Sequence, residues 1–325
     1  MTQGLRLLIK TIFREKECEM DRDNAIKEMR ALLKLMVEKK SSDMFITFNF
    51  PPAMKIDGLV TPVKDNALDL ESAKAMCYAI MNDRQVKEFE ATKECNFAIS
   101  PAGIGRFRVN AFVQQGSAGL VVRAIETEVP NIEKLGLPEV MKDVIMTKRG
   151  LVIMVGGTGS GKSTTLAAMI RHRNFHSMGH ILTIEDPIEF VHEDESCLVN
   201  QREIGIDSLT YAAALRAAMR ESPDVVMIGE IRDLVTMEAV LELCNTGHLV
   251  VSTLHSNNAN QALDRIVNLF ARENRDQVLM DLSLNLQGII SQRLVMGVDE
   301  TRVAAMEILI MTPHIRELVL SGQLT

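Results

Sequence analysis

The chain has 325 residues, of which 46% are hydrophobic and 24% charged, an ordinary composition for a folded globular protein of about two domains. Its net charge is −7, it has no tryptophan, and only 4% of its residues are aromatic. These totals argue against a nucleic-acid-binding protein, which usually presents a basic surface and, for single strands, aromatic stacking platforms. The sequence contains no apolar run of membrane-spanning length and no secretory signal pattern, so we expect a cytoplasmic protein.

The five cysteines give no framework for disulfides or zinc. They are odd in number, scattered, and never spaced as a C-x-x-C pair. This usage favours reduced thiols packed as small apolar groups. The cysteines are Cys18, Cys77, Cys95, Cys197 and Cys244.

Residues 1–24 form a predicted N-terminal extension. Leu5, Leu8, Ile9 and Ile12 fall at helical spacing beside basic residues, a pattern typical of helices that lie on anionic membrane surfaces. The interpretation we favour is a short extension packed on a neighbouring surface, or translation that starts at a later methionine.

Residues 25–125 are predicted to form a small α+β domain, followed by a linker over 126–140 that contains two prolines and a glycine. In chain order we expect a helix over 25–39, strands at MFITF (44–48) and AMKI (53–56), helices near 70–81 and 83–91, and strands at CNFAI (95–99), RFRVNAF (106–112) and GLVVRAI (119–125).

Residues 141–325 have a different pattern, with short continuous apolar runs separated by helical stretches. Runs without alternation are typical of strands buried on both faces of a parallel sheet, with helices as crossovers. We therefore predict an α/β domain with a mostly parallel sheet. The runs are LVIMV (151–155), HILTI (180–184), DVVMI (224–228) and LVVSTL (249–254).

Each of these four runs leads into a chemically active group. The first leads into a glycine-rich loop, the second into the acidic segment EDPIE (185–189), the third into Glu230 and the fourth into His255. Ligands of open parallel sheets bind at the carboxyl ends of the strands. We therefore expect these groups to gather at one edge of the sheet.

The glycine-rich loop has the form G-x-x-x-x-G-K-S, which holds nucleotide phosphates. Its glycines let backbone N–H groups turn toward phosphate oxygens, and the following helix adds its positive N-terminal end. We expect Lys162 on the β- and γ-phosphates and the Ser163 hydroxyl on Mg²⁺. The alternative, an incidental glycine turn with a surface lysine, fits poorly between an apolar strand and a helix. The predicted site comprises Gly156, Gly157, Thr158, Gly159, Ser160, Gly161, Lys162, Ser163 and Thr164.

Acidic groups complete the expected nucleotide site. Glu230 stands where a carboxylate holds the metal or its water, although a helix cap near Asp233 is the alternative. Among Glu185, Asp186 and Glu189, one is expected to orient the attacking water, and position alone does not choose among them.

The two histidines of the LVVSTL strand differ in position. His255 follows the strand, where contact with the γ-phosphate and a plain hydrogen-bonded loop position are equally consistent with the pattern. His248 precedes the same strand, so its position alone keeps it away from the expected nucleotide.

Two arginines of the first domain are expected to lie on one face of a sheet, and a third, on a nearby strand, is a candidate to join them. Arg106 and Arg108 are two residues apart in an alternating strand, and Arg123 lies on a nearby strand. The pattern suits either a solvated charged face or an arginine cluster presented to phosphate.

Four segments, GGTGSGKST, TIEDPIEF, VVMIGEIRD and TGHLVVSTLH, occur in an order and spacing that resemble the secretion ATPase superfamily of type IV pili and type II secretion. The resemblance extends from about Ala31 to the end of the chain. It implies a PAS-like domain followed by a RecA-like P-loop ATPase domain, assembled as a homo-hexamer. It also implies ATP and Mg²⁺ as ligands, and peripheral association with the inner membrane through a pilus platform protein.

The resemblance assigns roles at the predicted nucleotide site. Lys162 and Ser163 match the Walker A pair, and Glu230 matches the Walker B glutamate. Glu189, the last acid of the Asp box, matches the glutamate that activates water.

The same resemblance extends to residues that position alone did not place. His248 and His255 match the His box, so the resemblance, and not strand position, argues for His248. Arg106, Arg108 and Arg123 match arginines that reach the nucleotide when the two domains close.

Several segments resemble the retraction class of this superfamily. No cysteine follows Cys244, so the four-cysteine zinc element of extension and secretion ATPases is missing, and TPHIRELVLSG (312–322) resembles the C-terminal helix region of the retraction class. HSNNANQALDRI and MDLSLNLQGIISQRL resemble PilU-type more than PilT-type sequences. Family members continue through further C-terminal helices, so we expect the chain to be truncated at Thr325.

Two alternatives stay open. The first is an accessory ring subunit with weak intrinsic ATPase activity that supports a second, PilT-like retraction ATPase. The second is a ring ATPase that translocates nucleic acid, which the acidic net charge disfavours.

Overall fold

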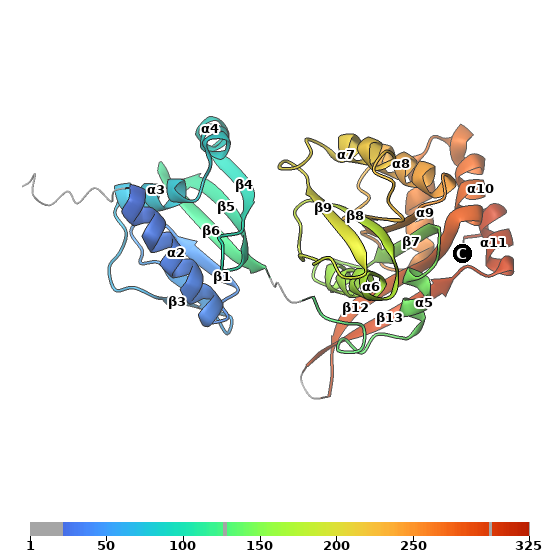
Figure 1. The fold of residues 1–325 in the computed structure, drawn as a ribbon, viewed down its shortest axis with the longest axis horizontal. Coiled ribbons are helices and arrows are strands. Elements are labelled where there is room, and N and C mark those ends of the chain that lie inside the picture. The colour runs from blue at the N-terminus through green and yellow to red at the C-terminus, as the bar shows by residue number, and fades with distance from the viewer. Residues whose placement is uncertain (1–21, 126–128, 299–300, 325) are drawn as a thin grey trace, which may run out of the picture. The chain divides into compact units, whose positions relative to one another are not determined.

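A computed structural model describes residues 22–125, 129–298 and 301–324 (Figure 1). The chain divides into two compact units, residues 1–127 and 128–325. The membrane-binding helix considered for residues 1–24 falls almost entirely outside the described residues. Within them, no helix is both long enough and apolar enough to cross a bilayer.

The first unit is a six-stranded antiparallel sheet in the order β3-β2-β1-β6-β5-β4, with helices packed against it (Figure 1). Its helix α2 turns Met29, Leu33 and Met36 inward, because residues three to four positions apart share one face of a helix. The elements are α2 (Arg22–Glu38), β1 (Asp43–Ile46), β2 (Ala53–Ile56), β3 (Leu59–Pro62), α3 (Leu70–Ala79), α4 (Asp83–Thr92), β4 (Glu94–Ile99), β5 (Arg106–Gln114) and β6 (Ser117–Ile125).

Strand β3 was not predicted. All four of its residues are exposed, so it has no buried face to give an alternating pattern. The other predicted strands and helices of this unit are present with shifts of a few residues at their ends. The structure thus confirms a small α+β unit, and its PAS-like character stays a prediction.

The second unit has a seven-stranded sheet in the order β13-β12-β7-β11-β10-β8-β9. Only β12 and β13 pair antiparallel; every other neighbouring pair is parallel. The strands are β7 (Gly150–Val155), β8 (Gly179–Glu185), β9 (Cys197–Glu203), β10 (Val225–Ile228), β11 (Leu249–Leu254), β12 (Leu286–Met296) and β13 (Arg302–Ile310). The predicted α/β architecture with a mostly parallel sheet is confirmed, as are the four predicted strands.

Helices cover both faces of this sheet (Figure 1). Leu151, Ile153 and Val155 of β7 pack into one core, and the alternate residues Val152 and Met154 pack into the other. Because both sets are buried, the strand has no polar face, which explains its continuous apolar sequence. The helices are α5 (Val140–Ile145), α6 (Lys162–His176), α7 (Tyr211–Ala218), α8 (Leu234–Asn245), α9 (Ala259–Leu269), the 3-10 turn η1 (Arg272–Asn274), α10 (Arg275–Asn285) and α11 (Pro313–Leu320).

The predicted linker, residues 126–140, contributes apolar side chains to the second unit. Ile132 and Leu137 are buried in the core that also contains Met141 of α5. The carbonyl of Val129 accepts a hydrogen bond from the Arg171 guanidinium on α6. From Val129 onward this segment is therefore anchored to the second unit.

Candidate functional site

The carboxyl ends of four adjacent strands meet at one edge of the larger sheet. In the order β7-β11-β10-β8, Val155 pairs with Leu254, Ile228 with Ser252, and Ile228 with Ile184. The glycine-rich loop, His255, Glu230 and the EDPIE segment follow these ends directly. The expected convergence of chemical groups is therefore present.

The glycine-rich loop curls back on itself before α6. Gly156, Gly159 and Gly161 have φ values of 151°, 74° and 84°, a region that favours glycine. A Cβ on Gly156 would lie 2.4 Å from the carbonyl oxygen of Gln292, so the first loop position also excludes any side chain sterically. The loop geometry thus requires glycine where the motif has it.

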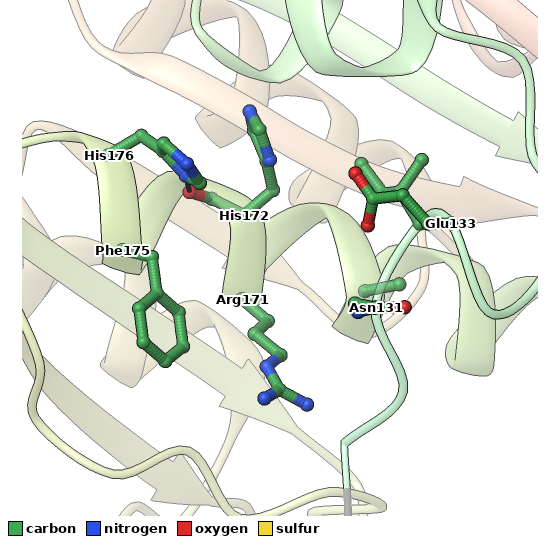
Figure 2. Close-up of a pocket in the computed structure, with 8 residues that line it drawn as sticks. Asn131, Glu133, Arg171, His172, Phe175 and His176 are labelled. Atoms are coloured by element: carbon green, nitrogen blue, oxygen red, sulfur yellow. Dashed lines mark hydrogen bonds between the residues drawn. The ribbon is translucent and has the colours of Figure 1, made fainter.

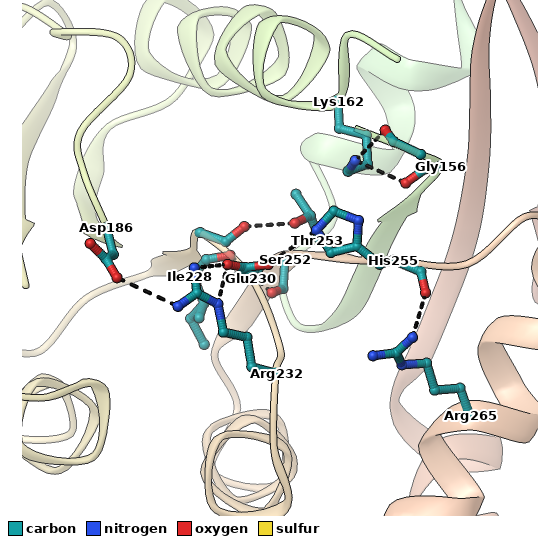
Figure 3. Close-up of polar contacts among 12 residues, drawn as sticks. Gly156, Lys162, Asp186, Ile228, Glu230, Arg232, Ser252, Thr253, His255 and Arg265 are labelled. Carbon is teal, nitrogen blue, oxygen red and sulfur yellow. Dashed lines mark hydrogen bonds and ion pairs between the residues drawn. The ribbon is translucent and has the colours of Figure 1, made fainter. Parts of the chain in front are cut away.

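Lys162 begins α6 and reaches back across the loop. Its Nζ donates hydrogen bonds to the carbonyl oxygens of Gly156 and Gly157, both at 2.9 Å (Figure 3). Burial lowers the pKa of this ammonium, and the negative charges of Glu230 and Glu189 partly offset that effect. The lysine is thus held at the loop by neutral acceptors that a charged phosphate would outcompete.

Glu230 follows β10 and lies between the side chains of Arg232 and His255 (Figure 3). It forms an ion pair with Arg232, and its Oε2 lies 3.3 Å from His255 Nε2. The alternative role as a helix cap belongs to Asp233, whose Oδ1 accepts a 2.8 Å hydrogen bond from the Thr236 N–H at the start of α8. Glu230 is therefore available to the edge where the loop lies.

The three acids of EDPIE have different surroundings. Glu185 is buried, and its Oε1 accepts from Thr183 Oγ1 at 2.7 Å; burial raises the pKa of its carboxyl to about 7. Asp186 Oδ2 lies 3.6 Å from Arg232 Nη1. Glu189 is exposed, and its charge acts on the pKa of Lys162. Of the three, Glu189 is the acid both exposed to solvent and electrostatically coupled to the loop lysine.

His248 lies at the opposite end of β11 from His255. Its Nδ1 is 3.0 Å from the carbonyl oxygen of Leu243 and 3.0 Å from Thr246 Oγ1. Within this chain it therefore does not join the edge that carries the glycine-rich loop, as its position in the sequence predicted.

The three arginines of the first unit share one face of its sheet. Arg108 of β5 pairs directly with Arg123 of β6, and Arg106 lies two positions before Arg108. The Arg123 Nε donates a 2.8 Å hydrogen bond to Oδ1 of the buried Asp43. The alternation that predicted this shared face is therefore present.

Comparison with known proteins identifies the family. Residues 19–320 match the family model described as "Type II/IV secretion system protein". The chain belongs to this family. It is 50% identical over 297 residues to the type IV pilus ATPase PilU of Pseudomonas aeruginosa, covering 91% of this chain and 78% of that protein.

Comparison with PilT, in sequence and in structure, supports the same family membership. The chain is 46% identical over 292 residues to the type IV pilus retraction ATPase PilT of P. aeruginosa, covering 90% of this chain and 85% of that protein. The crystal structure of the pilus retraction motor PilT with bound ADP superposes with a TM-score of 0.87 at 43% identity, covering 90% of this chain and 86% of that one.

In this secretion system family member, sequence reasoning missed several residues at the site. Arg232 bridges Glu230 and Asp186. Its position two residues after Glu230, the predicted metal ligand, is the feature of the sequence that could have identified it. Arg265 of α9 donates to the His255 carbonyl at 2.9 Å and, with Gly156 and Gly157, lines a cavity of about 360 Å³. Gln292 of β12 contacts the glycine-rich loop from a distant part of the chain.

Proposed function

We propose that this chain is a magnesium-dependent ATPase that drives retraction of type IV pili. The observation that carries the proposal is the shared strand edge, which brings the loop of Lys162 together with Glu230, His255 and the EDPIE segment. The retraction assignment rests on similarity to PilU and to PilT, a protein described as a retraction motor.

The residues present fit a magnesium nucleotide. A Cβ on Gly157 or on Gly159 would meet no atom within 4 Å, so the loop is open at these positions. Among the described residues, no three His, Cys, Asp or Glu side chains cluster as a metal cage. Mg²⁺ is usually held by one or two protein groups together with substrate phosphates. Ser163 and Glu230 would hold it, and the bound ion would neutralise charge on the phosphates.

The chain's own groups supply position and charge. Lys162 exchanges the carbonyls of Gly156 and Gly157 for phosphate oxygens, while the loop N–H groups bind the remaining oxygens. Glu189 orients the attacking water and accepts its proton. His255 holds Glu230 from the side opposite Arg232 and contacts the terminal phosphate.

The remaining predicted residues act in the assembled motor. In a homo-hexameric ring, closure of the two units within each subunit brings Arg106, Arg108 and Arg123 toward the nucleotide. His248 lies at the amino end of β11, which separates it from the glycine-rich loop of its own subunit. Its inclusion in the proposed motor therefore rests on family resemblance alone. The ring works on the cytoplasmic side of the inner membrane, against a pilus platform protein.

The chemical part of the proposal is tested with two substitutions and a control. Lys162→Ala should abolish turnover and weaken nucleotide binding, whereas Glu189→Ala should abolish turnover with binding retained. The exposed Glu195→Ala, six residues further along the same loop region, should leave both unchanged. Phosphate release and calorimetric titration with MgATP measure the two properties. Near-normal hydrolysis by Glu189→Ala would refute its role.

The biological part is tested by deleting the gene and scoring pilus retraction, with complementation by a Lys162→Ala copy. Failure of this copy supports a motor that works by its own hydrolysis. Full rescue would instead support an accessory subunit that helps a PilT-like partner, an alternative consistent with similarity to both PilU and PilT. Filter binding of DNA and RNA across a salt series tests the nucleic-acid alternative, and we expect no salt-sensitive retention.

A further inference from the structure

Strand β12 lies directly beside the strand that leads into the glycine-rich loop. Ser291 of β12 pairs with Val155, the last residue of β7, so Gln292 lies opposite Gly156, the first residue of the loop. Gln292 is only 2% exposed. A buried amide at this position needs hydrogen-bond partners, and it finds them in the loop.

The side-chain amide of Gln292 bonds two residues that flank Lys162 in the sequence. Its Nε2 donates to the carbonyl oxygen of Ser160 at 2.9 Å, and its Oε1 accepts from Thr165 Oγ1 at 2.8 Å. Because a carbonyl oxygen only accepts, the Ser160 contact fixes which end of the amide is the nitrogen. One side chain therefore connects the last turn of the loop with the first turn of α6.

The backbone packing points to the same residue. A Cβ on Gly156 would lie 2.4 Å from the carbonyl oxygen of Gln292, and a Cβ on Gly161 would lie 2.8 Å from its Nε2. Both glycines of the G-x-x-x-x-G frame are thus in close contact with a single residue of β12. Any displacement of Gln292 would be transmitted to both ends of the loop.

The Ser160 contact has a direct consequence for phosphate binding. In a trans peptide the C=O and the following N–H point in opposite directions. Since the Ser160 carbonyl is held toward β12, the Gly161 N–H is held away from β12. A loop of this kind binds phosphate with backbone N–H groups that point at the phosphate oxygens, so the direction of each N–H group matters for binding.

We propose that Gln292 is a positioning residue for the nucleotide, holding the loop in its phosphate-binding shape by bonding Ser160 and Thr165. This inference rests on the proposed ATPase function and deepens it. Gln292 touches neither the substrate nor the metal in this scheme; it acts through the loop.

The test compares substitutions of equal shape at two glutamines of the same strand. Gln292→Glu keeps the acceptor for Thr165 but sets a carboxylate against the Ser160 carbonyl. Gln287→Glu is the matched control, because Gln287 Nε2 makes the same kind of bond, 3.2 Å to the Arg149 carbonyl, at the other end of β12. Calorimetric titration with MgADP gives the dissociation constants, and thermal unfolding gives Tm.

We expect Gln292→Glu to weaken MgADP binding by about tenfold or more, the effect of one lost hydrogen bond, and Gln287→Glu to leave it within about twofold. Lowering the pH should protonate the introduced carboxyl, which then offers an O–H donor to the Ser160 carbonyl, and the loss of MgADP affinity should become smaller. Gln292→Met fills the same space with no donor and only a weak acceptor, so its loss of MgADP affinity should persist at every pH. Thr165→Val, which leaves the bond between Gln292 and Ser160 intact, should bind MgADP more tightly than either variant of Gln292.

A lowered Tm with unchanged MgADP affinity in both Gln292→Met and Gln292→Glu would overturn the inference and leave Gln292 as a packing residue. If Gln292→Glu does not fold, Gln292→Met and Thr165→Val are compared instead. A lowered Tm with unchanged MgADP affinity in both of them would again overturn the inference. Failure of the proposed function is distinguishable, because then the unaltered chain would not bind MgADP, or Lys162→Ala would bind it equally well.

Discussion

His255 Nε2 lies 3.3 Å from Glu230 Oε2 across the neighbouring strands β11 and β10. Glu230 is at the same time paired with Arg232, which also lies 3.6 Å from Asp186. Polar side-chain contacts thus connect the ends of three strands at the place where the nucleotide is proposed to bind. Substitutions in this group should therefore change catalysis more than folding.

His255→Asn should lower kcat on the order of 10²-fold, the usual cost of removing one preorganised donor at a reacting centre, with little change in KM. Steady-state ATP hydrolysis measures both constants. His314→Asn is the control, because His314 is an exposed residue of α11 and should leave both constants unchanged. An equal rise in KM with constant kcat would contradict a role confined to the transition state.

Arg232→Gln should reduce the Mg²⁺ concentration needed for half-maximal hydrolysis. Arg232 pairs with Glu230, and that pair must open for the carboxylate to hold a metal ion. The Arg232 side chain is 57% exposed, so the pair is worth at most about 1 kcal/mol and the shift should not exceed about fivefold. Arg216→Gln on α7, also exposed, should cause no shift. A higher magnesium requirement would show that Arg232 orients Glu230 and does not compete for it.

Glu185→Gln should make the stability of the second unit less dependent on pH. Burial raises the pKa of Glu185 to about 7 in the folded chain, above the 4.5 of an unperturbed carboxyl. A raised carboxyl pKa means that the folded state binds the proton more tightly, so stability falls as pH rises from about 4.5 through 7. The loss is at most about 3 kcal/mol.

Urea unfolding of Glu185→Gln and the unaltered chain at pH 5.5 and pH 8 checks this expectation. The substitution should be relatively stabilising at pH 8, where the buried carboxylate is charged, and less so at pH 5.5. Glu193→Gln, an exposed residue of the same loop, should give equal differences at both values. A difference for Glu185→Gln that is independent of pH would contradict burial as the origin of the shift.

Asp233→Ala should lower the free energy of unfolding by about 1 kcal/mol, because it removes the side chain that caps α8. The Thr236 N–H lowers the pKa of Asp233, so the stabilisation is present above pH 3.8 and is lost as pH falls through the folded value. ATP turnover by folded Asp233→Ala should be unchanged, whereas Glu230→Gln should lose turnover with little loss of stability. The reverse pattern would assign the cap to Glu230.

Features of this protein that depend on short segments could be predicted from the amino-acid sequence alone. The four apolar runs predicted strands β7, β8, β10 and β11, and the spacing from Gly156 to Ser163 predicted the phosphate-binding loop. Burial on both faces removes polar residues from a strand, and positive φ values select glycine. Both constraints act within about ten residues, so they are visible without knowledge of the fold.

The pairing of distant segments became known only from the folded chain. Strands β9, β12 and β13 mix polar and apolar residues, so their patterns did not predict strands. The contact between Thr165 and Gln292 joins residues 127 positions apart. Similarly, Arg232 reaches Asp186 because β10 lies beside β8 in the sheet. The order of strands in the sheet depends on how all the strands together are buried between two layers of helices. It therefore cannot be predicted from the pattern of any single segment.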